Sequence, residues 1–504
     1  MNRSARVTVL CLVLASQTSE AQQNPPQETT RQQLDRLTQA VAQAQAQVEA
    51  SQQQLLALKQ SLAALEQLLA KEDRSGAASA ALTKEDQTGA ASAALTGSTP
   101  DAPQQQAQLD DLRERQAMQQ SQIATLDQTK VESESKYPVK INGLILLNGF
   151  VNTSQVDIAS APTTAVPGGG STGASLRQTI LGIDARGPSL AGATSHADAS
   201  IDFFGSSTGS TTQTSYADVG GLLRLRTAHA SLDWQHTQAF VEMDRPILSP
   251  NSPTSLVAVA EPALAWSGNL WSWSPQAGVS HTLDLGGSSH LAIEAALMDV
   301  PDPPVAAAAT STSTVSQAEH SRWPGTEVHI GLWRTNEANG PAIGVGGYFS
   351  PHKTAGGADY DAWAGTLDLR LPLPLGLETT GSFYRGAALG GLGGGAYKDY
   401  IFDGAALALD DVGGWAQLKK RAGPRLEFNG AFGIDNAFAR EARGYTSTAT
   451  YQNLARNRSF FANAIYSPSA YLQFSLEVRH ISSTPTTGPS ANSNVIGLAA
   501  GYKF

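Results

Sequence analysis

The sequence is poor in cysteine, in charged residues and in long apolar runs, and each shortage excludes a class of protein. Only 15% of its 504 residues are charged, and its single cysteine, Cys11, lies near the N-terminus. Disulfides and thiolate metal sites are therefore not expected in the rest of the chain. The net charge of -10 and the lack of a Lys/Arg-rich run exclude nucleic acid as a partner. Beyond the first twenty residues, no stretch is apolar over the roughly 18 residues that a membrane-spanning helix needs.

The N-terminus does contain the pattern of a secretory signal peptide, which we assign to residues 1–21. Arg3 and Arg6 precede an apolar core, Val7–Ala15, and a small-residue cleavage site ends at Ala21. Cys11 lies within this apolar core and follows two large apolar residues. We therefore interpret it as part of the removed segment and not as a lipid-modified cysteine.

Residues 22–70 carry apolar side chains at alternating spacings of three and four, which is the seven-residue pattern of a coiled coil. A helix this rich in glutamine gains little from such a stripe alone, so the pattern predicts association with other chains; the alternative is one solvated helix lying on its own protein. Residues 71–103 hold a duplicated 13-residue spacer and a linker, and residues 104–136 form a second, shorter coiled-coil segment. The first stripe consists of Leu34, Leu37, Val41, Ala44, Val48, Ser51, Leu55, Leu58, Leu62, Leu65 and Leu69.

From residue 137 to residue 504 the apolar period changes to two, as in strands with one apolar and one polar face. Tight turns alternate with long loops, and an even number of strands with this asymmetry is typical of a transmembrane barrel, in which a closed sheet pairs every backbone group. The predicted fold class is an all-β transmembrane barrel of about 16 antiparallel strands, preceded by the α-helical coiled coil. The expected strands are 139–153, 176–187, 194–206, 221–234, 237–246, 272–285, 288–299, 325–334, 341–350, 361–371, 376–386, 411–421, 424–436, 457–467, 470–482 and 493–504.

The chain ends with alternating apolar residues and a terminal aromatic, which resembles the last-strand signature of bacterial outer-membrane proteins that the barrel assembly machinery reads. Here that set is Ile496, Leu498, Ala500, Tyr502 and Phe504. The stretch LLRLRTAHASLDW, residues 222–234, together with the preceding coiled coil, looks like the DcaP-like porins. This resemblance implies a trimeric diffusion channel of sixteen strands, with the coiled coil in the periplasm and organic anions such as dicarboxylates as solutes.

A barrel of sixteen strands is wide enough for an aqueous lumen, so its inward polar residues become candidate pore lining. Alternation that points Leu232 and Trp234 outward also points Arg224 and Arg226 outward, unless they lie above the hydrocarbon or a bulge turns them inward. In general porins the third long loop narrows the pore; here it is residues 247–271, with Glu261 as its only charge, and the alternative is a loop packed over the mouth or against a neighbouring subunit. The candidates are Arg186, Arg224, Arg226, Asp198, Asp202, Asp233, Glu242, Asp244, Glu261, Arg370 and Arg479, together with Asp184, Glu294, Asp368, Glu427 and Glu477.

The acids outnumber the bases in this set, so the residues themselves do not support anion selectivity. The predicted function is an outer-membrane porin, a passive channel for small hydrophilic solutes. Its expected partners are membrane lipid and lipopolysaccharide, further copies of the chain, the barrel assembly machinery and small polar solutes. The alternative is a structural tether, in which the barrel anchors a coiled coil that reaches the cell wall.

Catalytic and metal patterns are weak in this sequence, so neither an enzyme nor a cofactor is expected. GGSTG at residues 169–173 matches the nucleophile pattern of hydrolases, but it lies in an expected flexible loop and not between a strand and a helix. His229, Asp233 and His236 could suggest a metal site, although lumen lining and a turn explain them. The glycine-rich run 390–396 lacks the helix and the lysine of a phosphate-binding loop. The remaining enzymatic alternative is a hydrolase with a Ser/His pair on the outer rim of the barrel, in which His229 would be the histidine.

Overall fold

The fold is given by a computed structural model, which describes residues 138–205, 221–304, 315–334, 340–402, 406–438, 441 and 454–504. The predicted signal peptide, both coiled-coil segments and the duplicated spacer lie outside the described residues. The chain divides into two units, Met1–Gln106 and Ala107–Phe504, and the described residues belong to the second. Among the described residues, no helix has both the length and the apolarity to cross a membrane.

Most of the described residues are in strands, as the two-residue apolar period predicts. The long strands are β1 (Val139–Val156), β2 (Ala165–Ser175), β3 (Ile180–Leu190), β4 (Ala193–Gly205), β5 (Leu222–Asp233), β6 (Thr237–Asp244), β7 (Ser274–Gly286), β8 (Ser289–Met298), β9 (Gly325–Arg334), β10 (Ala342–Lys353), β11 (Asp359–Leu373), β12 (Leu377–Ala387), β15 (Asp410–Arg421), β16 (Leu426–Ala437), β17 (Leu454–Tyr466), β18 (Leu472–Pro485) and β19 (Ala491–Lys503).

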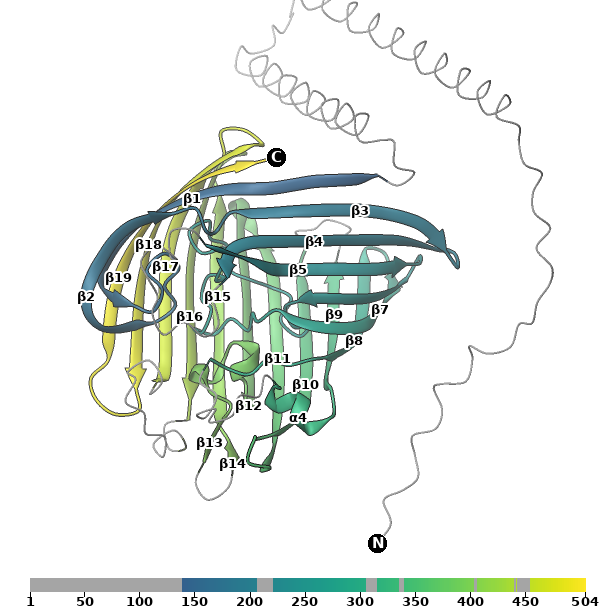
Figure 1. Cartoon of the computed structure of the whole chain (residues 1–504). Coiled ribbons are helices and arrows are strands. Elements are labelled where there is room, and N and C mark those ends of the chain that lie inside the picture. The colour runs from purple at the N-terminus through teal and green to yellow at the C-terminus, as the bar shows by residue number, and fades with distance from the viewer. Residues whose placement is uncertain are drawn as a thin grey trace, which may run out of the picture. The chain divides into compact units, whose positions relative to one another are not determined.

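These strands pair antiparallel with their chain neighbours, and the sheet closes where β1 meets β19 (Figure 1). Closure pairs nine consecutive positions, from Leu144 opposite Lys503 to Asn152 opposite Val495. The sheet has seventeen strands, but β2 and β3 both pair with β1, β2 along its second half and β3 along its first. They therefore share one position in the wall, which makes a closed barrel of sixteen positions, as predicted.

The outer surface of the barrel is apolar because each strand turns its apolar set outward. Leu476, Val478 and Leu498 are 50%, 52% and 57% exposed on adjacent strands. Inward neighbours such as Glu477 and Arg479 are almost fully buried. A closed sheet with this outer face presents hydrocarbon-compatible side chains and no unpaired strand edge, which is the requirement for strands in lipid. The structure is an all-β transmembrane barrel.

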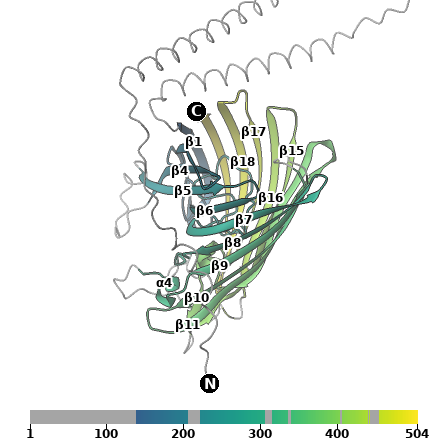
Figure 2. The ribbon, with the colours of Figure 1, turned by 90° about the vertical axis from the view of Figure 1, so that its right-hand side faces the viewer.

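The hydrophobic core lies inside the barrel, where two long loops fold against the inner wall. The first, residues 245–273, connects β6 to β7, and the second, residues 388–409, connects β12 to β15. Leu248 and Leu270 of the first loop cluster with Leu389 and Leu392 of the second, and all four are at most 2% exposed. Figure 2 shows β4–β9 following one another along one wall and β15–β18 standing on another.

Short elements occur within the loops. The second loop carries the 3-10 turns η2 (Gly390–Leu392) and η3 (Gly395–Tyr397) and the small strands β13 (Tyr400–Phe402) and β14 (Ala406–Ala408). The one-turn η1 (Pro374–Gly376) joins β11 to β12, and the short helix α4 (Gln317–Ser321) precedes β9. Ser316 caps α4 by accepting a hydrogen bond from the backbone N–H of Glu319, as in a capping box.

Two sequence-based expectations need correction. The segment 154–175 is not one loop, because β2 occupies Ala165–Ser175 and pairs with β1. The GGSTG pattern at residues 169–173 therefore lies within a strand. The glycines permit this pairing: a side chain on Gly170 would collide with the carbonyl of Asn152 on the neighbouring strand.

Candidate functional site

The inner loop 245–273 crosses the barrel interior and binds the opposite wall through side chains of that wall. Asn463 donates a hydrogen bond to the carbonyl of Thr254 at 2.9 Å, and Ser255 donates to the Glu477 carboxylate at 2.6 Å. Gln417 accepts from the backbone N–H of Thr254 at 2.6 Å. Asn463, Glu477 and Gln417 are at most 5% exposed. Polar residues of β15, β17 and β18 therefore serve as anchors for the loop.

The return of the loop is held by Gln178, which lies between β2 and β3. Its side-chain oxygen accepts the backbone N–H groups of Val259 and Ala260 at 2.7 and 3.0 Å. Its nitrogen donates to the carbonyl of Val257 at 2.8 Å. Gln178 is fully buried. One carboxamide thus satisfies three backbone groups of an otherwise irregular segment inside the barrel.

The arginines that alternation left ambiguous, Arg224 and Arg226, point inward because β5 carries a bulge. Thr227 pairs with Ser200 and Leu225 with Ile201, so that Arg226 is the additional residue. A bulge turns the following side chains to the other face. Leu225 is accordingly exposed on the outer surface. Of the alternatives drawn from the sequence, the bulge is the one that the structure contains.

These two arginines bind both the wall and the inner loop. Arg224 makes two hydrogen bonds to Asp202, at 3.1 and 2.7 Å, and a third to the carbonyl of Ala260 at 2.9 Å. Arg226 donates to the carbonyl of Val259 at 2.7 Å. Both guanidinium groups also lie over the ring of Trp273, at 5.0 and 4.6 Å from its centroid. We call this set the arginine layer: Asp202, Arg224, Arg226, Glu261 and Trp273.

Glu261, the only carboxylate of loop residues 247–271, contacts Arg224 less closely than Asp202 does. One of its oxygens lies 3.7 Å from the Arg224 guanidinium, and the other is buried without a hydrogen-bond donor among the described residues. Burial raises the pKa of Glu261 to about 8, and Arg224 offsets only part of this shift. The side chain therefore holds a proton at neutral pH.

The strands opposite the loop anchors carry alternating carboxylates and histidines on their inner face. His229 of β5 hydrogen-bonds Asp198 of β4 and Asp244 of β6, both at 2.9 Å. His329 of β9 contacts two acids in the same way. We call the whole set the acid–histidine array: Asp184, His196, Asp198, His229, Glu242, Asp244, Glu294, His329 and Asp368.

Hydrogen-bond geometry fixes the protonation of two of these histidines. An ionised carboxylate accepts hydrogen bonds and cannot donate one. Each ring nitrogen of His229 contacts a carboxylate oxygen, so when both acids are ionised both nitrogens donate and the ring is an imidazolium. His329 meets the same condition, with Nδ1 at 3.1 Å from Glu294 and Nε2 at 2.9 Å from Asp368. The array thus combines six carboxylates with at least two positive rings.

The array faces more open space than the anchoring wall. The side chains of Asp184, His196 and Asp198 are 36%, 34% and 32% exposed. Those of His229 and Glu294 are 26% and 29% exposed. Within the described ranges, no group of three or more histidines, cysteines or carboxylates is arranged to hold a metal ion.

Three of the remaining predicted pore residues lie in different environments. Arg186 is exposed near one end of β3, opposite His196. Asp233 accepts hydrogen bonds from Ser231 and Gln238 at the turn between β5 and β6. Arg479 points inward but is only 5% exposed, because it pairs with Glu477 at 2.6 Å and donates to the carbonyl of Pro162.

Arg370 of β11 donates to the carbonyl of Gly340 at 3.1 Å and lines an inner cavity that is described below. The two residues of the predicted assembly signal lie where β19 closes the barrel. Phe504 exchanges backbone hydrogen bonds with Gly143 at 3.1 and 3.2 Å, and Tyr502 is 47% exposed on the outer face.

Sequence reasoning missed His196, His329 and Gln178. The histidines alternate with apolar residues in HADASIDF and TEVHIGLW, so inward histidines beside inward acids were a readable signal. Gln178 offers no such signal, since its partners lie about 80 residues away along the chain, with separations of 79, 81 and 82.

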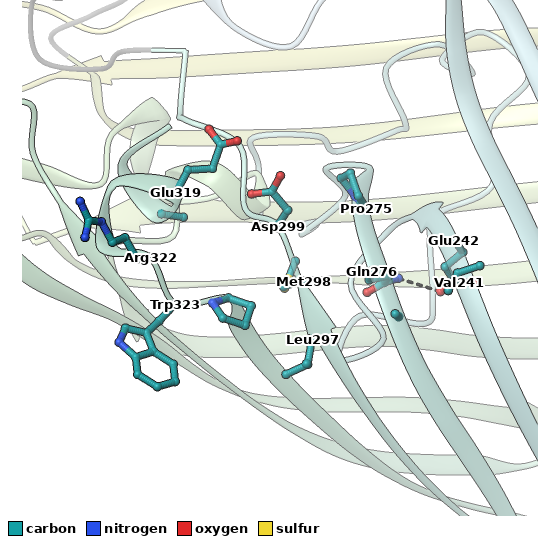
Figure 3. A pocket seen from close by; sticks show the side chains of 13 residues that line it. Val241, Glu242, Pro275, Gln276, Leu297, Met298, Asp299, Glu319, Arg322 and Trp323 are labelled. Atoms are coloured by element: carbon teal, nitrogen blue, oxygen red, sulfur yellow. Dashed lines mark hydrogen bonds between the residues drawn. The ribbon is translucent and has the colours of Figure 1, made fainter. Parts of the chain in front are cut away.

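A further hollow, of about 610 Å³, lies on the outer side of the barrel beside α4 (Figure 3). Its apolar lining includes Val241, Leu297 and Trp323, which are 57%, 53% and 69% exposed. Gln276, seen in the same view, donates to Glu242 at 2.7 Å. These three side chains belong to the outer face, whereas Glu242 of the acid–histidine array also lines the hollow.

Comparison with known proteins supports the fold assignment. No protein-family model and no curated protein matches the sequence. Among solved structures, the chain is similar to the outer membrane channel DcaP of Acinetobacter baumannii, with a TM-score of 0.56 and 18% identity over 73% of this chain and 99% of that one. It is also similar to an anion-selective porin from Comamonas acidovorans, with a TM-score of 0.47 and 9% identity over 73% and 100% of the two chains. The first similarity shows a shared fold.

Proposed function

We propose that the protein is a porin, a passive diffusion channel for small hydrophilic solutes across the bacterial outer membrane. The observation that carries this proposal is the unequal exposure of the inner wall. Asn463, Glu477 and Gln417, which anchor the loop, are buried beneath it, whereas Asp184, Asp198 and Glu294 of the acid–histidine array remain about one-third exposed. Space beside the loop that is lined by charged groups suits water and polar solutes.

The arginine layer supports a structural role for these residues in the channel. Arg224 donates hydrogen bonds to Asp202 and to the loop carbonyl of Ala260, and Arg226 donates one to the loop carbonyl of Val259. These contacts hold the loop near the wall, as a constriction requires. The resemblance of the sequence to DcaP-like porins suggests organic anions as solutes, but the six carboxylates of the array oppose an anion preference. We therefore assign no anion site to the arginine layer.

We infer in addition that the channel is a homo-oligomer, a trimer by resemblance, with its N-terminal coiled coil in the periplasm. The apolar outer face supports contact with lipid and lipopolysaccharide, and the aromatic end of β19 supports recognition by the barrel assembly machinery. Deletion of residues 31–130 tests the coiled coil. We expect the deletion to weaken oligomer assembly, whereas loss of cell-wall attachment with intact oligomers would favour the tether role.

Swelling of liposomes that contain the purified full-length protein tests the channel itself. We expect swelling in isotonic solutions of small sugars and amino acids, at rates that fall with solute size. Liposomes with folded protein that admit none of these solutes would favour the alternative, a closed barrel that serves as an anchor.

A further inference from the structure

A cavity lies beneath the first part of the inner loop, against β7–β11. Its volume is about 560 Å³, which is within the usual range for small-molecule sites. Pro250 and Asn251 line it from the loop. The strands contribute two acids, a histidine, an arginine, an indole ring and two hydroxyl groups, namely Glu294, Asp368, His329, Arg370, Trp333, Ser280 and Thr282.

The two acids in this cavity differ in what they can still bind. Asp368 is 4% exposed, and both its oxygens are engaged, one by His329 at 2.9 Å and the other by Asn251 at 3.1 Å. Glu294 keeps 29% of its side chain exposed, and His329 contacts only its Oε2. Among the described residues, none donates a hydrogen bond to Glu294 Oε1. Glu294 is therefore the acid that can accept a donor from a solute.

The geometry around His329 holds Glu294 in place. His329 lies directly opposite Glu294 in the sheet and reaches Asp368 across the intervening strand β10. The residue of β10 between them is Gly344, where any side chain would collide with both His329 and Asp368. Since the imidazolium bridges two carboxylates, this trio keeps one net negative charge. No ion pair joins Glu294 to Arg370.

The other lining residues suit a hydroxylated solute with a flat apolar side. Trp333 is half-buried and stacks on His290 at 5.5 Å, so its ring is fixed in orientation. Ser280 and Thr282 supply hydroxyl groups that both donate and accept. An indole face also attracts ammonium groups.

We propose that this cavity is a solute-binding subsite for small polyhydroxylated amines, in which the Glu294 carboxylate receives the ammonium group of the solute. Ser280 and Thr282 bond its hydroxyl groups, and Trp333 contacts its ring. This proposal rests on the proposed channel function. The subsite would bind amines during their passage and so favour them over neutral solutes of the same size.

The test measures how sugars interrupt the ion current of the full-length protein in planar bilayers. Glucosamine is compared with glucose, which has the same size and no ammonium group, in a mildly acidic buffer that keeps the amine charged. We expect glucosamine to block the current at concentrations roughly tenfold lower than glucose, the effect of one hydrogen bond to a charged group. In Glu294→Gln, which keeps size and shape, this difference disappears.

Asp359→Asn is the matched control, because it removes the same charge from an exposed position on β11 that does not line the cavity. This variant keeps the preference for glucosamine. Equal blocking by the two sugars in the unmodified channel overturns the subsite, and so does a preference that survives in Glu294→Gln. A protein that conducts no current at all contradicts the channel function instead, so the two failures are distinguishable.

Discussion

At the scale of single residues, Gly344 shows how an absent side chain positions charged ones. A carboxylate–imidazolium–carboxylate bridge that extends over four strands, β8 to β11, requires an empty position in β10, between His329 and Asp368. We expect Gly344→Ala to separate His329 from Asp368 and to destabilise the barrel by about 1–3 kcal/mol, through overpacking and a lost charged hydrogen bond. The loss of stability is measured as a lower temperature at which the folded band converts to the unfolded band on detergent gels.

The matched control for that prediction is Gly365→Ala on the next strand, where an added carbon meets nothing within 4 Å. This variant should unfold at the same temperature as the unmodified protein. Equal stability of the two variants would show that the bridge does not depend on the gap at Gly344.

Glu261 gives a prediction of pH dependence. Its pKa rises from 4.5 to about 8 when the loop is bound. A carboxyl group with a raised pKa binds its proton more tightly in the bound state, so the bound loop is most stable at low pH and loses stability as the pH rises from 4.5 to 8. Above about pH 8 we expect larger fluctuations of the single-channel current, because the loop is less firmly bound. Glu261→Gln should remove this dependence on pH. Asp359→Asn, at an exposed site, should leave it intact.

Sequence reasoning at this scale succeeded where alternation is regular and failed where it is not. Asp198, Glu242, Asp244 and Glu294 lie on the inner face as alternation predicted. The direction of Arg224 depended on a bulge that two-residue alternation cannot locate. Arg479 points inward as predicted, but its burial depends on the loop carbonyl of Pro162, more than 300 residues away along the chain.

At the scale of elements, the inner loop has no regular secondary structure and is held by side chains of the wall. Of the side chains named above, Gln178 forms the most hydrogen bonds to the loop, three in all. We expect Gln178→Ala to leave buried backbone groups unpaired, at about 1–3 kcal/mol for each unsatisfied group, and so to release the loop. The measurement is the unitary current, which should become larger and noisier.

Gln238→Ala is the control for this loop prediction, because within the described part of the chain the Gln238 side chain donates to Asp233 near the β5–β6 turn and to no loop residue. It should conduct as the unmodified protein does. A Gln178→Ala channel with unchanged current would mean that the other anchors, such as Asn463 and Glu477, suffice to hold the loop.

Most strand bounds could be predicted to within about three residues, since the alternation and the tight turns are local signals. The exception was β2, whose glycine-rich sequence reads as a loop. Its backbone pairing with β1, together with the hydrogen bond from the Asn152 side chain to Ser171 at 3.0 Å, is a tertiary interaction that the local sequence does not signal. The path of the loop 245–273 was likewise expected only from resemblance, because its anchors are distant in the sequence.

At the scale of the whole molecule, barrel closure depends on the pairing of β1 with β19. The Phe504 ring packs next to Gly143, and its backbone exchanges two hydrogen bonds there. We expect Phe504→Ala to lower the amount of folded protein in the outer membrane by roughly tenfold, through impaired recognition and a weaker seam. The fraction of folded barrel in isolated outer membranes measures this effect, with Lys503→Ala as the control. Equal yields of the two variants would argue against a role for the terminal ring.

The channel function requires a continuous aqueous path beside the inner loop. Single-channel recording in planar bilayers tests it most directly. We predict stepwise current increases whose size scales with the salt concentration, as expected for a water-filled pore. Folded, inserted protein that produces no current steps at any salt concentration would contradict the claim.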